Sequence, residues 1–426
     1  MSGRPRTAVL YGDASLELPP TPMPLDRIPA RCPARRGAAA ASLEAALSRP
    51  IGSAALEEVV RGARKVLVVV SDATRSTGSA LFLPPLVERI RRAGGASITF
   101  LVASGIHRPP TDAEIEAILS PALAARFPAL RHDPDDTRRL VPVGTTRSGT
   151  LVRVNAALRE HDRVILTGGA GFHYYAGFSG GRKALVPGLA ARDTVTRNHL
   201  RALSATGARA PGARAGRLAR NPVHRDMVEG AALVSADFLL NTVLDEQGAC
   251  EAVFAGHWRR AHEAACRYLR ATRVLRVEPR DFVLASAGGE PADIDLIQAH
   301  KAYEAAVGAV RPGGPVILVA RCRKGAGHPD FLPWFRFRSE PELVRELKRN
   351  FQVYGQTALS WLRKTRSHPL ILVSGLPADL VRSLGAEPAA DLEQALRIVR
   401  EIVGPAARGW LLDGGARTLI EPAASP

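Results

Sequence analysis

The chain of 426 residues has few cysteines and no long apolar run. Its four cysteines, Cys32, Cys250, Cys266 and Cys322, form no CxxC or CxxxC pair, which argues against a zinc site or a disulfide framework and favours a reducing compartment. No stretch approaches the roughly 18 apolar residues of a membrane span, and the start MSGRPRTAVLYGD lacks the apolar region of a signal peptide. We therefore expect a soluble cytoplasmic protein that does not contact a membrane.

Lysine is also scarce. The chain has six lysines, at positions 65, 183, 301, 324, 348 and 364, against 52 arginines. Arginine keeps its proton in proteins, whereas a partly buried lysine can become a neutral amine that forms a covalent bond to a cofactor. Lys183 stands beside a glycine-rich run, so it is a candidate for such a bond. The alternative is that Lys183 falls there by chance and contacts a phosphate, and the residues alone leave both interpretations open.

Lysine and arginine together outnumber the acidic residues, which gives a net charge of +17 and a pI near 10.7. Such a charge is often found in nucleic-acid-binding proteins. Here the arginines are scattered among Ala, Pro and Gly, no basic strip is interleaved with aromatics, and the densest run, Arg209–Arg220, lies in an expected mobile loop. We expect a solvated basic surface and no nucleic-acid partner.

Short β-branched runs alternate with amphipathic ones, a pattern typical of parallel sheets covered by helices. The expected strands are Lys65–Ser71, Ser97–Ala103, Arg163–Thr167, Phe238–Val243, Phe282–Ser286, Pro315–Ala320, Leu370–Ser374 and Gly409–Leu412, and the expected helices are Leu81–Arg92, Thr111–Leu119, Pro222–Val234, Asp293–Val310, Pro341–Lys348 and Asp391–Val403. A break near 275–281 predicts two α/β domains, 1–274 with the cofactor-binding loops and 275–426, whose last helix or strand packs back on the first. The active site is expected in the cleft between them.

Three segments that follow expected strands carry the polar residues of interest. They are Asp72–Arg75, Gly105–Pro109 with His107, and Gly168–His199 with His173, Lys183 and His199. Loops after parallel strands build ligand sites in α/β proteins. The glycines between His173 and Lys183 permit positive φ and close approach of a ligand, although Lys183 lacks the flanking residues of a P-loop.

Each candidate histidine has a structural alternative, because a lone histidine is usually a satisfied core or surface residue. The position of His107 in a Gly/Pro loop and of His173 before the glycine run favours a functional role for both. For His199 alone the functional and structural interpretations are evenly balanced, and the other eight histidines are expected to be structural.

Zinc motifs are missing, but one imidazole suffices for nickel if a cofactor supplies the remaining ligands. Gln298 and Lys301 lie three apart on one helical face, where they can bind a small carboxylate together; the alternative for Lys301 is a solvated surface lysine.

Seven segments in sequence order resemble the nickel-pincer lactate racemase family. They are DATR at Asp72–Arg75, GIHRPPT at Gly105–Thr111, HYYAGFSGGRK at His173–Lys183, NH at Asn198–His199, NPVHRDM at Asn221–Met227, DFLLNTV at Asp237–Val243 and DIDLIQAHK at Asp293–Lys301. The resemblance runs from about residue 60 to 330 and more weakly to the end.

The resemblance implies a 2-hydroxyacid racemase or epimerase with a covalently bound nickel-pincer nucleotide, a pyridinium bisthiocarboxylate mononucleotide. It implies that Lys183 is the tether, that His199 is the nickel ligand, and that His107 and His173 are the acid/base pair. It further implies that Asp72, Ala73, Thr74 and Arg75 bind the cofactor and that Arg75, Gln298 and Lys301 bind the substrate. Cofactor-synthesis and nickel-insertion enzymes would be partners.

The residue types agree with racemisation in which a hydride is removed and returned through a 2-keto acid. The two enantiomers present the hydroxyl group in two directions, so two bases are needed, and two histidines are present. One departure is Ile297, where lactate-specific members carry Tyr, so the substrate need not be lactate. Two other functions remain: a non-catalytic relative that binds ligand or cofactor, and a nucleotide-dependent transferase on the same fold.

Overall fold

The computed structural model describes residues 8–28, 39–245 and 248–423, so that Cys32 lies outside the described residues. The chain forms two compact units. The larger unit holds residues 39–272, and the smaller unit holds residues 8–28 together with 273–423. The chain passes from the larger to the smaller unit near residue 273. Residues 8–28 differ from the expectation of a first domain over 1–274, because their strand β3 (Leu25–Arg27) pairs with β19 (Gly409–Leu412) of the smaller unit.

The larger unit is built on a six-stranded sheet in the order β13-β12-β9-β4-β5-β6. All neighbours are parallel except β12 and β13. The strands are β4 (Lys65–Ser71), β5 (Ser97–Ala103), β6 (Ala129–Arg131), β9 (Arg163–Gly169), β12 (Phe238–Leu244) and β13 (Cys250–Gly256). Strands β7 (Leu140–Thr145) and β8 (Leu151–Asn155) form a separate hairpin.

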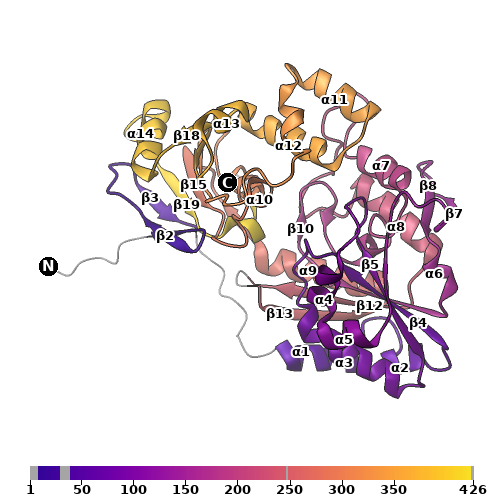
Figure 1. Ribbon diagram of the computed structural model, residues 1–426. Helices are drawn as coiled ribbons and strands as arrows, with labels where there is room; N and C mark the ends of the chain where they lie inside the picture. The colour runs from indigo at the N-terminus through magenta and orange to yellow at the C-terminus, as the bar shows by residue number, and fades with distance from the viewer. Residues whose placement is uncertain (1–7, 29–38, 246–247, 424–426) are drawn as a thin grey trace. The chain divides into compact units, whose positions relative to one another are not determined.

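Both faces of this sheet are buried, as alternation along β4 shows. Val66, Val68 and Val70 join one core, and Leu67 and Val69 join the other. The first core is covered by α1 (Ala39–Ser48), α2 (Leu56–Val59), α3 (Ser79–Arg92), α4 (Asp112–Leu119) and α5 (Pro121–Arg126), which Figure 1 shows together along one face. The second is covered by α6 (Ala157–Glu160), α7 (Arg192–Leu200), α8 (Pro222–Val234) and α9 (Trp258–Arg273).

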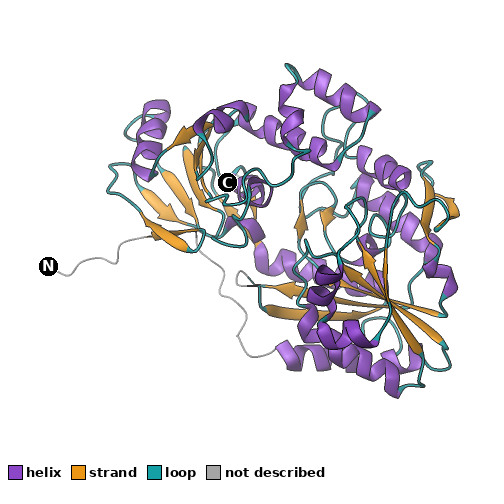
Figure 2. Cartoon of the chain, viewed as in Figure 1, coloured by secondary structure: helices purple, strands orange, loops and turns teal. Residues whose placement is uncertain are grey.

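The smaller unit contains an all-parallel sheet in the order β18-β17-β16-β15-β19-β3. Its further strands are β15 (Phe282–Ser286), β16 (Val316–Val319), β17 (Leu370–Val373) and β18 (Glu387–Ala389), and its helices are α10 (Leu296–Ala306), α11 (Glu340–Arg349), α12 (Val353–Ser367), α13 (Ala378–Ser383) and α14 (Leu392–Val403). Two small pairs complete it: β1 (Ala8–Tyr11) with β2 (Ala14–Glu17), and β14 (Val274–Val277) with β20 (Leu419–Pro422). The last strand therefore pairs with a strand of its own unit. Figure 2 shows strands flanked by helices in each unit, so the expected two α/β domains with mainly parallel sheets are confirmed.

The eight expected strands are all present, and the expected helices are found with small shifts at their ends. The largest shifts are at α10, which spans Leu296–Ala306 and not Asp293–Val310. Its start is fixed by Asp295, whose side chain accepts a hydrogen bond from the Gln298 backbone N–H as an N-cap. Among the described residues, no helix is both long and apolar enough to span a bilayer.

A buried carboxylate joins the helices and the hairpin on the second face of the larger sheet. Asp226 of α8 is 1% exposed. Its two oxygens accept hydrogen bonds from Thr146 Oγ1 at 2.6 Å, Thr150 Oγ1 at 3.1 Å and Asn198 Nδ2 at 2.9 Å, and it pairs with Arg201 Nε at 3.2 Å. Through Asn198 this carboxylate fixes the last turn of α7, where His199 stands.

We expect Asp226→Ala to lower the free energy of unfolding by about 3 kcal/mol or more, because it leaves several buried donors unsatisfied. Urea unfolding of the full chain measures the effect. Asp135→Ala is the matched control, since Asp135 forms an exposed pair with Arg192, and it should cost less than about 1 kcal/mol. Equal effects for the two variants would contradict the role given to Asp226.

Candidate functional site

Two of the predicted segments follow the adjacent strands β4 and β5 and meet through a hydrogen bond. His107 Nδ1 lies 2.9 Å from Asp72 Oδ2. Asp72 Oδ1 accepts hydrogen bonds from the backbone and hydroxyl of Thr74, and the Arg75 N–H donates to the Asp72 carbonyl at 3.0 Å. The turn that follows β4 is therefore folded around the Asp72 carboxylate, which presents one oxygen to the turn and the other to His107.

The ionisation of Asp72 results from opposing effects. Burial, the largest, favours the neutral acid, but the hydrogen bonds and charge of His107, the Thr74 hydroxyl and the charge of Arg75 together hold its pKa below the ordinary value. A carboxylate that is ionised next to His107 fixes the ring orientation. Because it can only accept, His107 donates from Nδ1 and presents Nε2 as its second nitrogen.

The segment after β9 folds back as a small hairpin of β10 (Phe172–His173) and β11 (Gly177–Phe178). Gly177 has φ +82°, and a side chain there would place its Cβ 2.0 Å from the Arg217 carbonyl oxygen. Only glycine is compatible with both constraints. The Asn221 side chain adds a hydrogen bond to the Tyr175 carbonyl at 2.8 Å, so the irregular segment 201–221 supports this hairpin.

His173 occupies the hairpin next to two tyrosine rings. Its Nδ1 accepts a hydrogen bond from the Ala176 backbone N–H at 3.3 Å, and its ring stacks on Tyr174 at a centroid distance of 5.3 Å. Burial, followed by the charges of Lys183 and Arg75, holds the pKa of His173 well below the ordinary histidine value. His173 is therefore a neutral imidazole.

His199 stands in the last turn of α7 and is 3% exposed. The Tyr175 ring lies 4.5 Å from His173 and 5.2 Å from His199 between centroids, so one buried tyrosine connects the two histidines. Burial, followed by the charge of Lys183, lowers the pKa of His199 to about 3, and the Val195 carbonyl acts in the opposite direction. His199 thus has a neutral imidazole that can bind a metal ion.

Lys183 lies in a short 3₁₀ helix, η1 (Gly181–Ala184), directly after the glycine run. Burial, followed by the charges of Arg75 and Arg182, lowers the pKa of Lys183 well below the ordinary lysine value. The Tyr175 ring contacts both His173 and His199, and the charge of Lys183 acts on both histidines. These residues lie in the larger unit, as do Ala73, Thr74 and Arg75, which are exposed on the turn after β4.

Gln298 and Lys301 belong to α10 of the smaller unit and lie on one face of that helix, as predicted. Lys301 Nζ donates to Gln298 Oε1 at 2.6 Å. Gln298 is half-buried and Lys301 is exposed. The two side chains form a local pair that offers N–H donors to a carboxylate.

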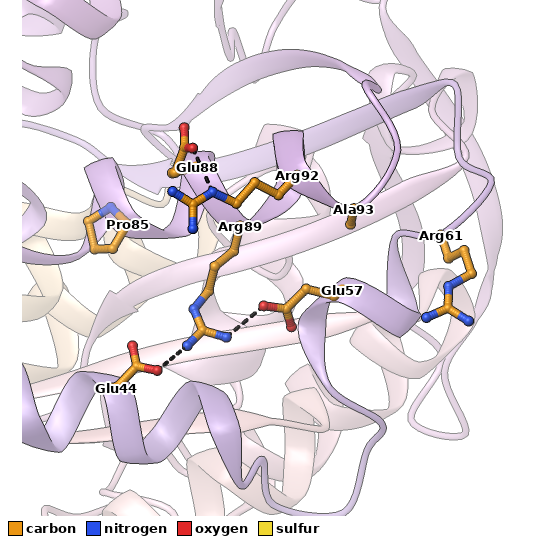
Figure 3. A pocket seen from close by; sticks show the side chains of 8 residues that line it. All are labelled: Glu44, Glu57, Arg61, Pro85, Glu88, Arg89, Arg92 and Ala93. Carbon is orange, nitrogen blue, oxygen red and sulfur yellow. Dashed lines mark hydrogen bonds and ion pairs between the residues drawn. The ribbon is translucent and has the colours of Figure 1, made fainter.

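In the described residues, the candidates form no protein-only metal site, and the cavity described below is lined by other residues. Within residues 8–28, 39–245 and 248–423, no three His, Cys, Asp or Glu side chains are grouped to hold a metal ion. A cavity of about 660 Å³ lies between α1, α2 and α3, where Arg89 bridges Glu44 and Glu57 (Figure 3). None of the candidate residues lines this cavity.

Sequence reasoning missed two residues that stand beside the candidates. Arg182 is buried, and its NH1 lies 3.1 Å from Nε2 of His262, a histidine expected to be merely structural. Cys266 lies next to the same ring, with Sγ 3.5 Å from His262 Nε2. The position of Arg182 between the glycine run and Lys183 could have singled it out in the sequence. In a chain with so many arginines, however, one more arginine does not stand out.

Two family models match the chain. The lactate racemase N-terminal domain matches residues 11–210, and the lactate racemase C-terminal domain matches residues 275–419. A lactate racemase from Thermoanaerobacterium thermosaccharolyticum is 30% identical over 382 residues, which cover 88% of this chain and 89% of the relative. A lactate racemase from Lactiplantibacillus plantarum is 32% identical over 387 residues, which cover 89% of this chain and 90% of the relative.

Solved structures agree with these sequence matches. The lactate racemase apoprotein from Thermoanaerobacterium thermosaccharolyticum superimposes with a TM-score of 0.89 at 28% identity, covering 98% of this chain and 100% of that one. A protein from Thermotoga maritima shares the fold, with a TM-score of 0.65 at 21% identity over 86% of this chain and 96% of its own. The chain belongs to the lactate racemase family.

Proposed function

We propose that this protein is a racemase or epimerase of a 2-hydroxy acid that works with a nickel-pincer nucleotide bound to Lys183. The observation that carries the proposal is a carboxylate-bonded imidazole, His107, in the same unit as three basic side chains whose charged forms are disfavoured, His173, Lys183 and His199. Such a set contains proton-transfer groups, a nucleophile and a metal ligand in one place. The two curated relatives, both lactate racemases, support the reaction class.

The residues present fit the proposed cofactor. A neutral Lys183 amine can form a covalent bond to it, and the neutral imidazole of His199 can supply one nickel ligand. With no group of three metal-ligating side chains in the described residues, the other ligands would come from the nucleotide. When bound, the nickel-pincer nucleotide would take up the hydride from the hydroxyl-bearing carbon of the substrate and give it back.

His107 is set up to accept the hydroxyl proton. Its Nδ1 donates to Asp72, so Nε2 carries the lone pair. As His107 becomes cationic, the Asp72 carboxylate balances the new charge without moving. A base held in this way is pre-organised for one direction of the hydroxyl group.

His173 is set up differently. Because Nδ1 accepts the Ala176 N–H, the ring hydrogen of the neutral form is on Nε2, where it can donate a hydrogen bond to the substrate oxygen; His173 gives up a proton as an acid only after it has taken one up to form the imidazolium. When the other enantiomer binds, His173 becomes the base once this hydrogen moves to Nδ1. That change costs one hydrogen bond of 3.3 Å, which is long and therefore weak.

The substrate carboxylate is assigned to Arg75, Gln298 and Lys301. Arg75 is exposed on the turn after β4, and the other two offer N–H donors along α10. Ile297 precedes Gln298, and its Cδ1 lies near the backbone of Gly327, where an added Cβ would be 3.0 Å away. We propose that Ile297 contacts the substituent on the substrate's third carbon and so selects among 2-hydroxy acids.

The cofactor assignment is tested by producing the protein together with the pincer-synthesis enzymes. We expect about one nickel per chain in metal analysis, a mass increase on the peptide that contains Lys183, and neither in Lys183→Arg. A panel of 2-hydroxy acids followed by chiral chromatography then identifies the substrate. An unmodified Lys183 without nickel would refute the proposal, whereas modification without turnover of any acid would indicate a non-catalytic cofactor-binding protein.

His107→Ala and His173→Ala should each lower kcat about 10²–10⁴-fold, the usual contribution of one acid or base. For a racemised acid the equilibrium constant is one, so kcat/KM must fall equally for both enantiomers. His161→Ala is the control, because His161 bonds only the Ala157 carbonyl in the same unit. Full activity of either site variant, with Lys183 modified as in the parent protein, would remove that histidine from the mechanism.

A further inference from the structure

Strand β12 carries a polar side chain directly after an apolar stretch. Asn241 follows Phe238–Leu240 and is 0% exposed. Asparagine is disfavoured in strands, and burying its amide costs free energy unless the polar atoms are hydrogen-bonded. A leucine would pack in the same space at a lower cost, so the presence of Asn241 calls for a reason beyond the sheet itself.

The Asn241 amide is fully used in hydrogen bonds. Nδ2 donates to the Gly168 carbonyl at 3.1 Å and to the Leu240 carbonyl at 3.2 Å, and Oδ1 accepts the Gly181 N–H at 2.9 Å. Because two of these partners can only accept and the third can only donate, the orientation of the amide is determined. Asn241 thus joins the end of β9, where Gly168 stands opposite it in the sheet, to the start of η1.

The bond to Gly181 falls at the most pliable point of the loop before Lys183. Gly180 and Gly181 have φ +78° and +56°, and glycine has more backbone freedom than any other residue. Gly181 is the first residue of η1, so its N–H has no acceptor within that helix, and Asn241 supplies one. A side chain at Gly180 would place its Cβ 2.7 Å from Asn241 Oδ1, so this glycine also makes room for the contact.

We infer that Asn241 is a positioning residue that holds the Lys183 side chain in a fixed place for the cofactor. The inference rests on the proposed tether at Lys183. The Lys183 N–H closes the turn of η1 on the Gly180 carbonyl at 3.2 Å, so the backbone of the lysine follows directly from the point that Asn241 pins. Holding a reacting group in position beforehand removes much of the entropic cost of a reaction.

The effect of Asn241 is expected to be local. The earlier part of the loop is closed without it, because the Ser179 N–H donates to the Gly171 carbonyl at 2.8 Å. Loss of the Asn241 amide should therefore loosen residues 180–183 and leave the β10–β11 hairpin in place. A general contribution to stability would not single out the residues around Lys183.

The first measurement is amide hydrogen exchange, resolved to single residues, in the full-length protein made without pincer-synthesis enzymes. Asn241→Leu removes the side-chain hydrogen bonds at nearly constant volume. We expect the Gly181 and Lys183 amides to exchange about tenfold faster or more, because a buried hydrogen bond that holds them is lost. The amides of residues 172–178 should keep the rates of the parent protein.

Asn155→Leu is the matched control. Asn155 is also a buried asparagine of the larger unit, and its Oδ1 accepts the Ala157 N–H at 3.0 Å, so the variant loses a comparable hydrogen bond elsewhere. It should lower the thermal unfolding temperature, as Asn241→Leu does, but leave exchange at 180–183 unchanged.

The second measurement uses protein produced together with the pincer-synthesis enzymes. We expect about tenfold less modified Lys183 in Asn241→Leu than in the parent protein at equal times, and the parent amount in Asn155→Leu. Among modified chains of Asn241→Leu, kcat should fall while KM for the acid stays near the parent value, because the groups proposed to bind the substrate carboxylate are unchanged.

Asn241→Ser provides a second comparison if Asn241→Leu does not fold, since its side chain is too short to bond both Gly168 and Gly181. Parent-like exchange at 180–183 or parent-like modification in a folded Asn241 variant would overturn the inference, as would an equal loss of modification in Asn155→Leu. If the parent protein itself carries no modification, the proposed function fails, whereas faster exchange confined to 180–183 would still show that Asn241 fixes the place of Lys183.

Discussion

Partial burial of Lys183 and His173 and full burial of His199 are the constraint on which the rest of the site depends. Burial is the first cause of the lowered pKa of each of these groups, and nearby cations add to it. The charged form of each of these three basic side chains is thereby disfavoured. Nucleophilic attack, metal binding and proton acceptance all require a free lone pair. One physical condition would thus serve the three chemical tasks proposed for these side chains.

His107 differs because a carboxylate faces it. Its side chain is 27% exposed, and Asp72 fixes one ring nitrogen, whereas His173 is enclosed among tyrosines and accepts a backbone N–H. The two imidazoles therefore present opposite hydrogen-bonding groups from Nε2. An enzyme that acts on both enantiomers of a substrate needs two such groups. Here the different hydrogen bonding of the two imidazoles comes from the loops after β5 and β9.

Periodicity in the sequence was enough to predict the strands and the segments after them, because β-branched runs such as Lys65–Ser71 coincide with buried strands. The seven ordered motifs pointed to the family. Pairing of Leu25–Arg27 with β19 could not be predicted, since three residues carry no periodic signal. The burial of Asp226 and Arg182 could not be predicted from the sequence either. The chain has 52 arginines and many acidic residues, and only the structure shows which of them are buried and which groups they bond.

The adjacent cations Arg182 and Lys183 are not interchangeable. A lysine at 182 would share the same buried surroundings and could itself lose its proton, which the arginine does not. An arginine at 183 could not supply a nucleophilic amine. The order is also fixed by the backbone, because the residue at 182 points to Ala176, Gly180 and His262. In the proposed attachment of the cofactor, position 183 must give up a proton, which a lysine can do and an arginine cannot.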